Sequence, residues 1–192
     1  CFGNFAAALL HHDKTAPLPF ETMAGVVTAT FEKDGNVTVN LTNPHSMQLF
    51  VLNADPTVGA DVHFLNTGVP HAVAFLDKLE GLDISRLGAY LRYHEAFSPK
   101  GTNANFARIL SPGHIAIRTY ERGVEDETLA CGTGMTACAL LHAVLTDAPS
   151  PIQVDVAGGD TLKVGFQRTG DRFTDVTLTG PADLVFTGDI QI

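Results

Sequence analysis

Alternation of apolar and polar positions predicts many strands in this chain. The clearest case lies on either side of Asp34-Gly35-Asn36, where alternating β-branched residues predict a hairpin over residues 25–41. Asn43-Pro44-His45 then ends its second strand. Similar patterns, separated by turn residues, predict strands over residues 61–66, 72–75, 104–110, 114–120, 152–156, 161–167, 174–178 and 183–192.

Three segments carry helical patterns instead, at residues 2–12, 83–91 and 135–145. The last of them is apolar and is predicted to be a central helix. Strands grouped around two apolar helices are typical of an α+β protein, and the arrangement favours two similar halves.

The boundary between the two halves is expected near residues 43–58. This assigns residues 1–45 to what remains of a first domain and residues 46–182 to a second domain. Residues 183–192 are expected to form a final strand that returns to the first domain.

The composition favours a soluble enzyme of the cytoplasm. Hydrophobic residues make up 45% of the chain and the mean hydropathy is +0.12, yet no apolar run is long enough to span a bilayer. A net charge of −9 with only 12 Lys and Arg residues argues against nucleic acid as a partner. Three cysteines suggest reduced thiols, and the spacing of Cys131 and Cys138 fits no zinc site, so we expect no metal.

The candidate chemistry centres on Cys131, which precedes Gly132-Thr133-Gly134 and the helix over 135–145. The first amides of a helix lack intrahelical partners, so they favour negative charge, lower a thiol pKa and can hold a carboxylate. The alternative is that Cys131 is a small buried hydrophobic residue. A cysteine in the core, however, needs no glycines after it, whereas a site in which a ligand touches the backbone does. Cys138, amid Ala and Leu, is predicted to pack in the core.

Residues 120–134, Tyr-Glu-Arg-Gly-Val-Glu-Asp-Glu-Thr-Leu-Ala-Cys-Gly-Thr-Gly, resemble the second active-site motif of the diaminopimelate epimerase family. Residues 66–73, 101–106 and 178–182 agree with the family in order and spacing, so the similarity spans nearly the whole chain. The resemblance implies two pseudo-symmetric domains, each a curled, mostly antiparallel sheet around a central helix, with the active site in the cleft between them. It also implies a homodimeric, cofactor-independent isomerase that interconverts LL- and meso-diaminopimelate for lysine and peptidoglycan precursors.

Such a reaction requires two acid/base groups. Inverting an α-carbon without pyridoxal phosphate means removing a proton from one face and returning one to the other. A thiolate and a thiol can do this and exchange roles with the direction of reaction. Charge that develops toward the α-carboxylate would be stabilised by amides at a helix N-terminus, which Gly132 and Thr133 supply here.

The resemblance also assigns residues to roles. Cys131 would be a catalytic thiol, and His71 and Glu121 would modulate the pKa of a catalytic cysteine. The substrate-binding residues would be Asn103, Glu121, Arg122, Gly132 and Thr133.

Each of these positions also has a simpler interpretation. A lone His is more often packed, a Glu-Arg pair more often solvated, and an Asn after Gly101 more often part of a turn. We read His45 as a chance match to the Pro-His of the motif, and residues 125–127 as a solvated acidic turn. One departure from the family is Val69, where an Asn that contacts substrate is common.

The first segment, Cys1-Phe2-Gly3-Asn4-Phe5, matches the family's first motif only in part. Turn chemistry favours Cys1 as the trailing, packing cysteine of that motif. The catalytic partner and the start of the first domain would then precede Cys1. The alternative makes Cys1 itself the partner, with Phe2 where the family keeps a glycine.

Two other functions remain open. Proline and hydroxyproline racemases share the Cys-Gly-Thr-Gly segment but typically carry Ser-Pro before it, where this chain has Leu129-Ala130. A catalytically silent relative that binds small molecules through the same fold is the third hypothesis.

Overall fold

The computed structural model describes residues 13–22, 25–183 and 188. The helix predicted over 2–12, and Cys1 with it, lies outside the described residues. So does most of the strand predicted over 183–192.

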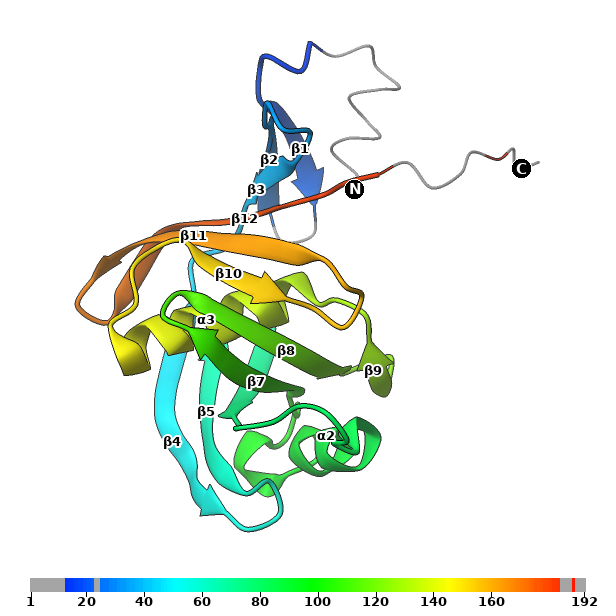
Figure 1. Ribbon diagram of the computed structural model, residues 1–192, viewed down its shortest axis with the longest axis vertical. Helices are drawn as coiled ribbons and strands as arrows, with labels where there is room; N and C mark the ends of the chain where they lie inside the picture. The colour runs from blue at the N-terminus through cyan, green and yellow to red at the C-terminus, as the bar shows by residue number, and fades with distance from the viewer. Residues whose placement is uncertain (1–12, 23–24, 184–187, 189–192) are drawn as a thin grey trace.

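Within the described part, one curled sheet surrounds a central helix (Figure 1). The strands are β1 (Leu18–Thr22), β2 (Gly25–Phe31), β3 (Val37–Asn40), β4 (His45–Asp55), β5 (Ala60–Asn66), β6 (Pro70–Phe75), β7 (Asn103–Ser111), β8 (His114–Glu121), β9 (Asp126–Thr128), β10 (Ile152–Asp155), β11 (Thr161–Thr169) and β12 (Arg172–Gly180). The helices are α2 (Ile84–Arg92), α3 (Gly132–Thr146) and the short 3-10 helix η1 (Glu95–Phe97).

The strand order is β1-β2-β3-β12-β11-β10-β8-β7-β6-β5-β4, with β9 paired to β8. The pairs β6–β7 and β8–β10 are parallel, and the other described pairs are antiparallel. This confirms the predicted α+β class and the curled, mostly antiparallel sheet around a helix.

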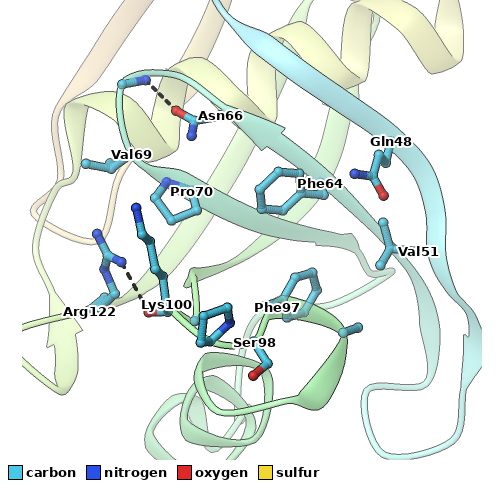
Figure 2. A pocket seen from close by; sticks show the side chains of 14 residues that line it. Gln48, Val51, Phe64, Asn66, Val69, Pro70, Phe97, Ser98, Lys100 and Arg122 are labelled. Carbon is cyan, nitrogen blue, oxygen red and sulfur yellow. Dashed lines mark hydrogen bonds between the residues drawn. The ribbon is translucent and has the colours of Figure 1, made fainter.

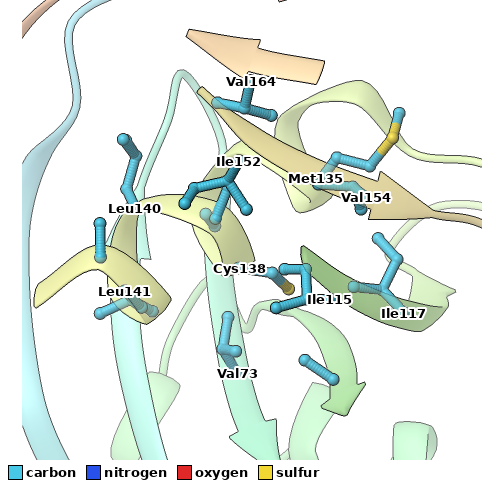
Figure 3. Packing of buried hydrophobic residues seen from close by; sticks show 14 of the residues in the cluster. Val73, Ile115, Ile117, Met135, Cys138, Leu140, Leu141, Ile152, Val154 and Val164 are labelled. Atoms are coloured by element: carbon cyan, nitrogen blue, oxygen red, sulfur yellow. The ribbon is translucent and has the colours of Figure 1, made fainter. Parts of the chain in front are cut away.

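Helix α3 is buried around its circumference because the sheet wraps it. A helix that is apolar on all sides is stable only in such a position. Its Ala and Leu residues pack against strands on both sides, as Figure 3 shows for Leu140 and Leu141 with Val73, Ile115, Ile152, Val154 and Val164. Cys138 is fully buried in this core, so its predicted packing role is confirmed.

The opposite face of strands β5 to β8 packs against α2. Alternation along each strand separates the two cores: Val73 joins the cluster around α3, while its neighbours Ala72 and Ala74 join the cluster with Leu87 and Leu91 of α2. Residues two apart on one of these strands therefore face the same helix.

The hairpin predicted over 25–41 is confirmed as β2 and β3. Strand β3 pairs with the end of β12, through Val37–Asn40 opposite Thr177–Gly180. The sheet thus joins an early segment to a late one before residue 183 is reached.

Strand β4 was not predicted, since only a domain boundary was expected there. Its register against β5 slips three times, and Ser46, Phe50 and Ala54 all have positive φ. Each bulge adds an unpaired residue and shifts the side-chain alternation, so the sequence shows no period of two. The short strands β1 and β9 were also missed.

Candidate active site

Polar side chains gather at one end of the sheet face that meets α3. His71 on β6 is paired in register with Asn103 on β7, and Asn105 on β7 with Thr119 on β8. These four side chains are buried. They lie on the same face as Val73, Ala107 and Ile117 of the central core, by the period of two along each strand. Glu121, two residues after Thr119, continues this polar row.

Cys131 occupies the N-cap position of α3. Its backbone is extended, with φ −131° and ψ 108°, and its side chain makes no capping hydrogen bond. The thiol is 8% exposed, and its Sγ lies 3.6 Å from the Thr133 hydroxyl. The cysteine therefore sits at an open helix start, as the sequence predicts.

The expected lowering of the Cys131 pKa was wrong for this structure. Burial raises the pKa of the thiol, and the Glu121 carboxylate raises it further, because both disfavour a thiolate. The Thr133 hydroxyl and the Gly134 and Thr133 amides oppose this without cancelling it. In this arrangement Cys131 is a protonated thiol, and the implied role of Glu121 as a pKa modulator stays a prediction.

The glycine turn after Cys131 is held against the sheet. The Thr67 hydroxyl donates to the Thr133 carbonyl at 2.9 Å, which ties the turn between β5 and β6 to the start of α3. A Cβ on Gly134 would collide with the Asn105 amide oxygen, so this glycine is needed for close packing. Gly132 has more room, with the flexible Leu178 side chain 3.2 Å from its ideal Cβ.

His71 is completely buried beside Asn105. Burial lowers the pKa of its imidazole to about 3, and the nearby Arg122 guanidinium contributes to the lowering. Its Nδ1 lies 3.1 Å from the Asn105 amide nitrogen, while Nε2 has no hydrogen-bond partner among the described residues. His71 is therefore neutral and keeps one ring nitrogen available.

Asn103 joins three strand ends. Its amide nitrogen donates to the Pro70 carbonyl at 2.9 Å, and its amide oxygen accepts from the Arg122 backbone N–H at 2.8 Å. In the described structure this side chain positions Arg122 next to the turn before β6.

A pocket of about 450 Å³ opens beside Arg122 (Figure 2). Its cationic side chains are Lys100 and Arg122, and no described Asp or Glu lines it. Arg122 also donates from Nη1 to the Lys100 carbonyl at 3.2 Å. Apolar walls come from Val51, Phe64 and Phe97. In a chain of net charge −9, two cations in a pocket lining that includes no described Asp or Glu suit an anionic ligand group.

Sequence reasoning missed Lys100, Asn66 and Asn105. Asn66 lines the pocket next to Val69, where the family commonly has an Asn, and its Oδ1 accepts from the Gly68 N–H. Asn105 stands two residues after Asn103, so the two side chains lie on the same face of the strand. This spacing could have identified Asn105 from the sequence. For Lys100 the sequence offers no such signal.

The acidic turn over residues 125–127 is only partly solvated, with Asp126 exposed and Glu125 and Glu127 half-buried. Glu125 accepts from Arg92 Nε at 3.1 Å and from the Tyr93 hydroxyl, Asp126 accepts from Ser85, and Glu127 forms a two-pronged pair with Arg118. These bonds anchor the turn that follows Glu121 and Arg122 against α2 and β8.

Within the part of the chain that the structure describes, no group of three or more His, Cys, Asp or Glu could hold a metal ion. No helix in that part is both long and apolar enough to cross a membrane.

Comparisons with known proteins show the family of the chain. A family model described as diaminopimelate epimerase matches residues 63–185. The chain is 42% identical to the diaminopimelate epimerase of Aquifex aeolicus (strain VF5), over 90% of this chain and 61% of that protein. It is 41% identical to the diaminopimelate epimerase of Hydrogenobaculum sp. (strain Y04AAS1), over 97% of this chain and 68% of that protein. The chain thus spans about three fifths to two thirds of the length of these relatives.

Among solved structures, the fold resembles that of a probable proline racemase from Agrobacterium radiobacter K84. The TM-score is 0.63 at 21% identity, over 86% of this chain and 57% of the other. At that identity the likeness shows a shared fold.

Proposed function

Because the chain belongs to the diaminopimelate epimerase family, we propose that the complete protein interconverts LL- and meso-diaminopimelate without a cofactor. It works in the cytoplasm as a homodimer and supplies precursors of lysine and peptidoglycan. The observation that carries the proposal is the Cys131 thiol at the open start of α3, next to Glu121 and the buried polar row.

The cationic pocket suits a substrate that has a carboxylate at the end remote from the reacting carbon. The distal carboxylate of diaminopimelate would lie near Arg122 and Lys100. Position 69, where the family commonly has an Asn that contacts substrate, is Val here, and the nearby Asn66 would make that contact instead. Asn103 would hold the Arg122 backbone in position. The reacting α-carboxylate would meet the amides of Gly132 and Thr133 at the start of α3.

The chemistry follows from the protonation of Cys131. A thiolate on the other face of the α-carbon takes the α-proton, and the electron pair of the broken C–H bond spreads toward the α-carboxylate. Cys131, held as a thiol by burial and Glu121, gives its proton to the opposite face and becomes a thiolate. Cys138 cannot be the second base because it is fully buried. We assign that base to a cysteine of the first domain.

The proposed domains keep the boundaries expected from sequence, with residues 1–45, 46–182 and 183–192 as the units. A small core that contains Ala29 and Val37, separate from the core around α3, supports assigning the β1–β3 segment to a different domain. Ala182, the last residue of the second unit, also joins this small core, next to the segment expected to return to the first domain.

Solvent exchange tests the function. The complete protein is incubated in D₂O with LL-diaminopimelate, and the α-proton and both stereoisomers are followed by NMR and chiral chromatography. Deuterium should enter at the α-carbon as the meso form appears. Exchange with proline or hydroxyproline but not with diaminopimelate would assign a racemase instead, and exchange with none of them would leave a binding protein.

A further inference from the structure

The Asn105 side chain makes three hydrogen bonds and is fully buried. Its amide nitrogen is 3.0 Å from the Ala72 carbonyl oxygen and 3.1 Å from His71 Nδ1, and its amide oxygen accepts from the Thr119 hydroxyl at 3.1 Å. A carbonyl oxygen can only accept, so the nitrogen of the amide must be the group that faces Ala72. The orientation of the amide is thereby fixed.

This orientation determines the protonation pattern of the imidazole. An amide nitrogen carries two hydrogens, of which one goes to Ala72 and the other to His71 Nδ1. Nδ1 must then act as an acceptor and carry no hydrogen. In a neutral ring the single proton has to sit on Nε2.

We propose that Asn105 is a positioning residue that locks His71 in the tautomer with hydrogen on Nε2, so that this N–H can donate to an anionic group in the active site. The proposal rests on the proposed function for the identity of that group, which is a thiolate or a substrate carboxylate. The lock itself rests only on the contacts of Asn105.

The free end of the ring supports this role. Nε2 is buried and finds no hydrogen-bond partner among the described residues. A buried donor without an acceptor costs free energy, so the unpartnered Nε2 calls for an explanation, and a ligand or a reaction step supplies one. Burial and Arg122 hold the ring neutral, so it is ready to donate one hydrogen.

The lock is also coupled to the cysteine turn. Gly134 packs so closely on the Asn105 amide oxygen that a Cβ there would collide with it. One amide thus touches the glycine turn after Cys131 on one side and the imidazole on the other. A change at Asn105 should therefore disturb His71 without removing any group that touches substrate.

NMR of the complete protein labelled with ¹⁵N-histidine tests the tautomer at neutral pH, with His71→Gln identifying the signal. The wild type should show His71 with Nδ1 unprotonated and Nε2 protonated. Asn105→Asp presents a carboxylate oxygen to Nδ1 and should move a proton onto that nitrogen. Asn105→Leu, of similar shape but without a donor, is the second variant in case the carboxylate variant does not fold. It should give a mixture of the two His71 tautomers.

Thr119→Val is the matched control, because it removes a bond of the same amide but leaves the Ala72 contact that sets its orientation. It should lower stability and keep the wild-type ring signature. A wild-type His71 protonated at Nδ1 or at both nitrogens would overturn the proposal, as would an unchanged signature in Asn105→Leu.

Kinetics separate the lock from the proposed function. If the function holds, Asn105→Leu should lower kcat at least tenfold with a change in KM of less than threefold, since substrate contacts remain. If the wild type shows the expected ring signature but does not act on diaminopimelate, the proposed function fails and the tautomer lock stands.

Discussion

Helices α2 and α3, the two α-helices of the described residues, begin in opposite ways. Helix α2 starts with Asp83, whose carboxylate accepts the Arg86 backbone N–H at 3.0 Å, the usual way to satisfy a free amide. Helix α3 starts with Cys131, whose side chain makes no such bond. The other end of α3 is closed, since Arg168 donates to the Ala143 carbonyl at 2.6 Å. Among the described residues, the start of α3 thus differs from the start of α2 in having no side-chain cap.

The difference separates a structural helix end from a reactive one. The Asp83 side chain occupies an amide at the start of α2 that a ligand could otherwise use. The start of α3 has a thiol, glycines and free amides in a buried polar setting, which costs stability that the surrounding core supplies. Functional sites often break a local folding rule in this manner.

The largest expected effect comes from the thiol at the open end. Cys131→Ser should lower epimerisation in the complete protein by at least about 1000-fold, equivalent to roughly 4 kcal/mol of barrier. The change is nearly isosteric, so thermal unfolding should shift little. Exchange of the α-proton in D₂O measures the rate from both stereoisomers.

Cys138→Ala is the control for that substitution. It trims a buried thiol in the core of the same helix and should cost about 1 kcal/mol of stability while activity remains near the wild-type value. If Cys131→Ser kept wild-type turnover, Cys131 would not be an acid/base group.

The glycines at the open end should differ from each other. Gly134→Ala should lower the free energy of unfolding by about 3 kcal/mol, because its Cβ meets the fixed Asn105 amide. Gly132→Ala should cost less, since the Leu178 side chain can move. Denaturant unfolding of both variants measures the difference, and equal costs would show that the turn is not packed as described.

Lowering the pH should destabilise the fold, because His71 is buried in its neutral form near the start of α3. The pKa of His71 is lowered from 6.5 to about 3, so between these values the unfolded chain binds a proton that the folded chain does not. Stability therefore falls as the pH drops through this window, by about 2 kcal/mol at pH 5 from this group. Unfolding free energies at pH 7 and pH 5 should show it, and His71→Gln should reduce the loss. Equal losses in the variant and the wild type would contradict a neutral, buried His71.

The sequence predicted most strands because the alternation that buries one face is visible in one dimension. It also predicted α3, because a run of Ala and Leu favours a helix and is stable only when it is buried. It failed at β4, where bulges at Ser46, Phe50 and Ala54 move residues off the alternation. The hairpin around Gly35 was thus predictable from its regular alternation, whereas the irregular strand β4 was not.

For the site, the motifs singled out His71, Asn103 and Cys131, and the structure pairs His71 with Asn103 on neighbouring strands and puts Cys131 at the start of α3. Their roles stay predictions. The electrostatics around these residues were harder to foresee. The Cys131 pKa depends on burial and on Glu121, which outweigh the helix amides, and neither burial nor distance is written in the sequence. The hydrogen bonds of the acidic turn were not predicted because its partners, among them Arg92 and Arg118, come from other segments of the chain.

The smallest expected effect lies at the capped helix and tests the comparison from the other side. Asp83→Ala removes the side-chain acceptor for the Arg86 amide and should cost about 1 kcal/mol of stability, the usual value of an N-cap. Because α2 packs on the sheet face opposite α3, kcat and KM should stay at wild-type values. Asp83→Asn, which retains a capping oxygen, should recover most of the stability. A large loss of activity in Asp83→Ala, with the fold intact, would mean that the two helix starts are coupled rather than separate in purpose.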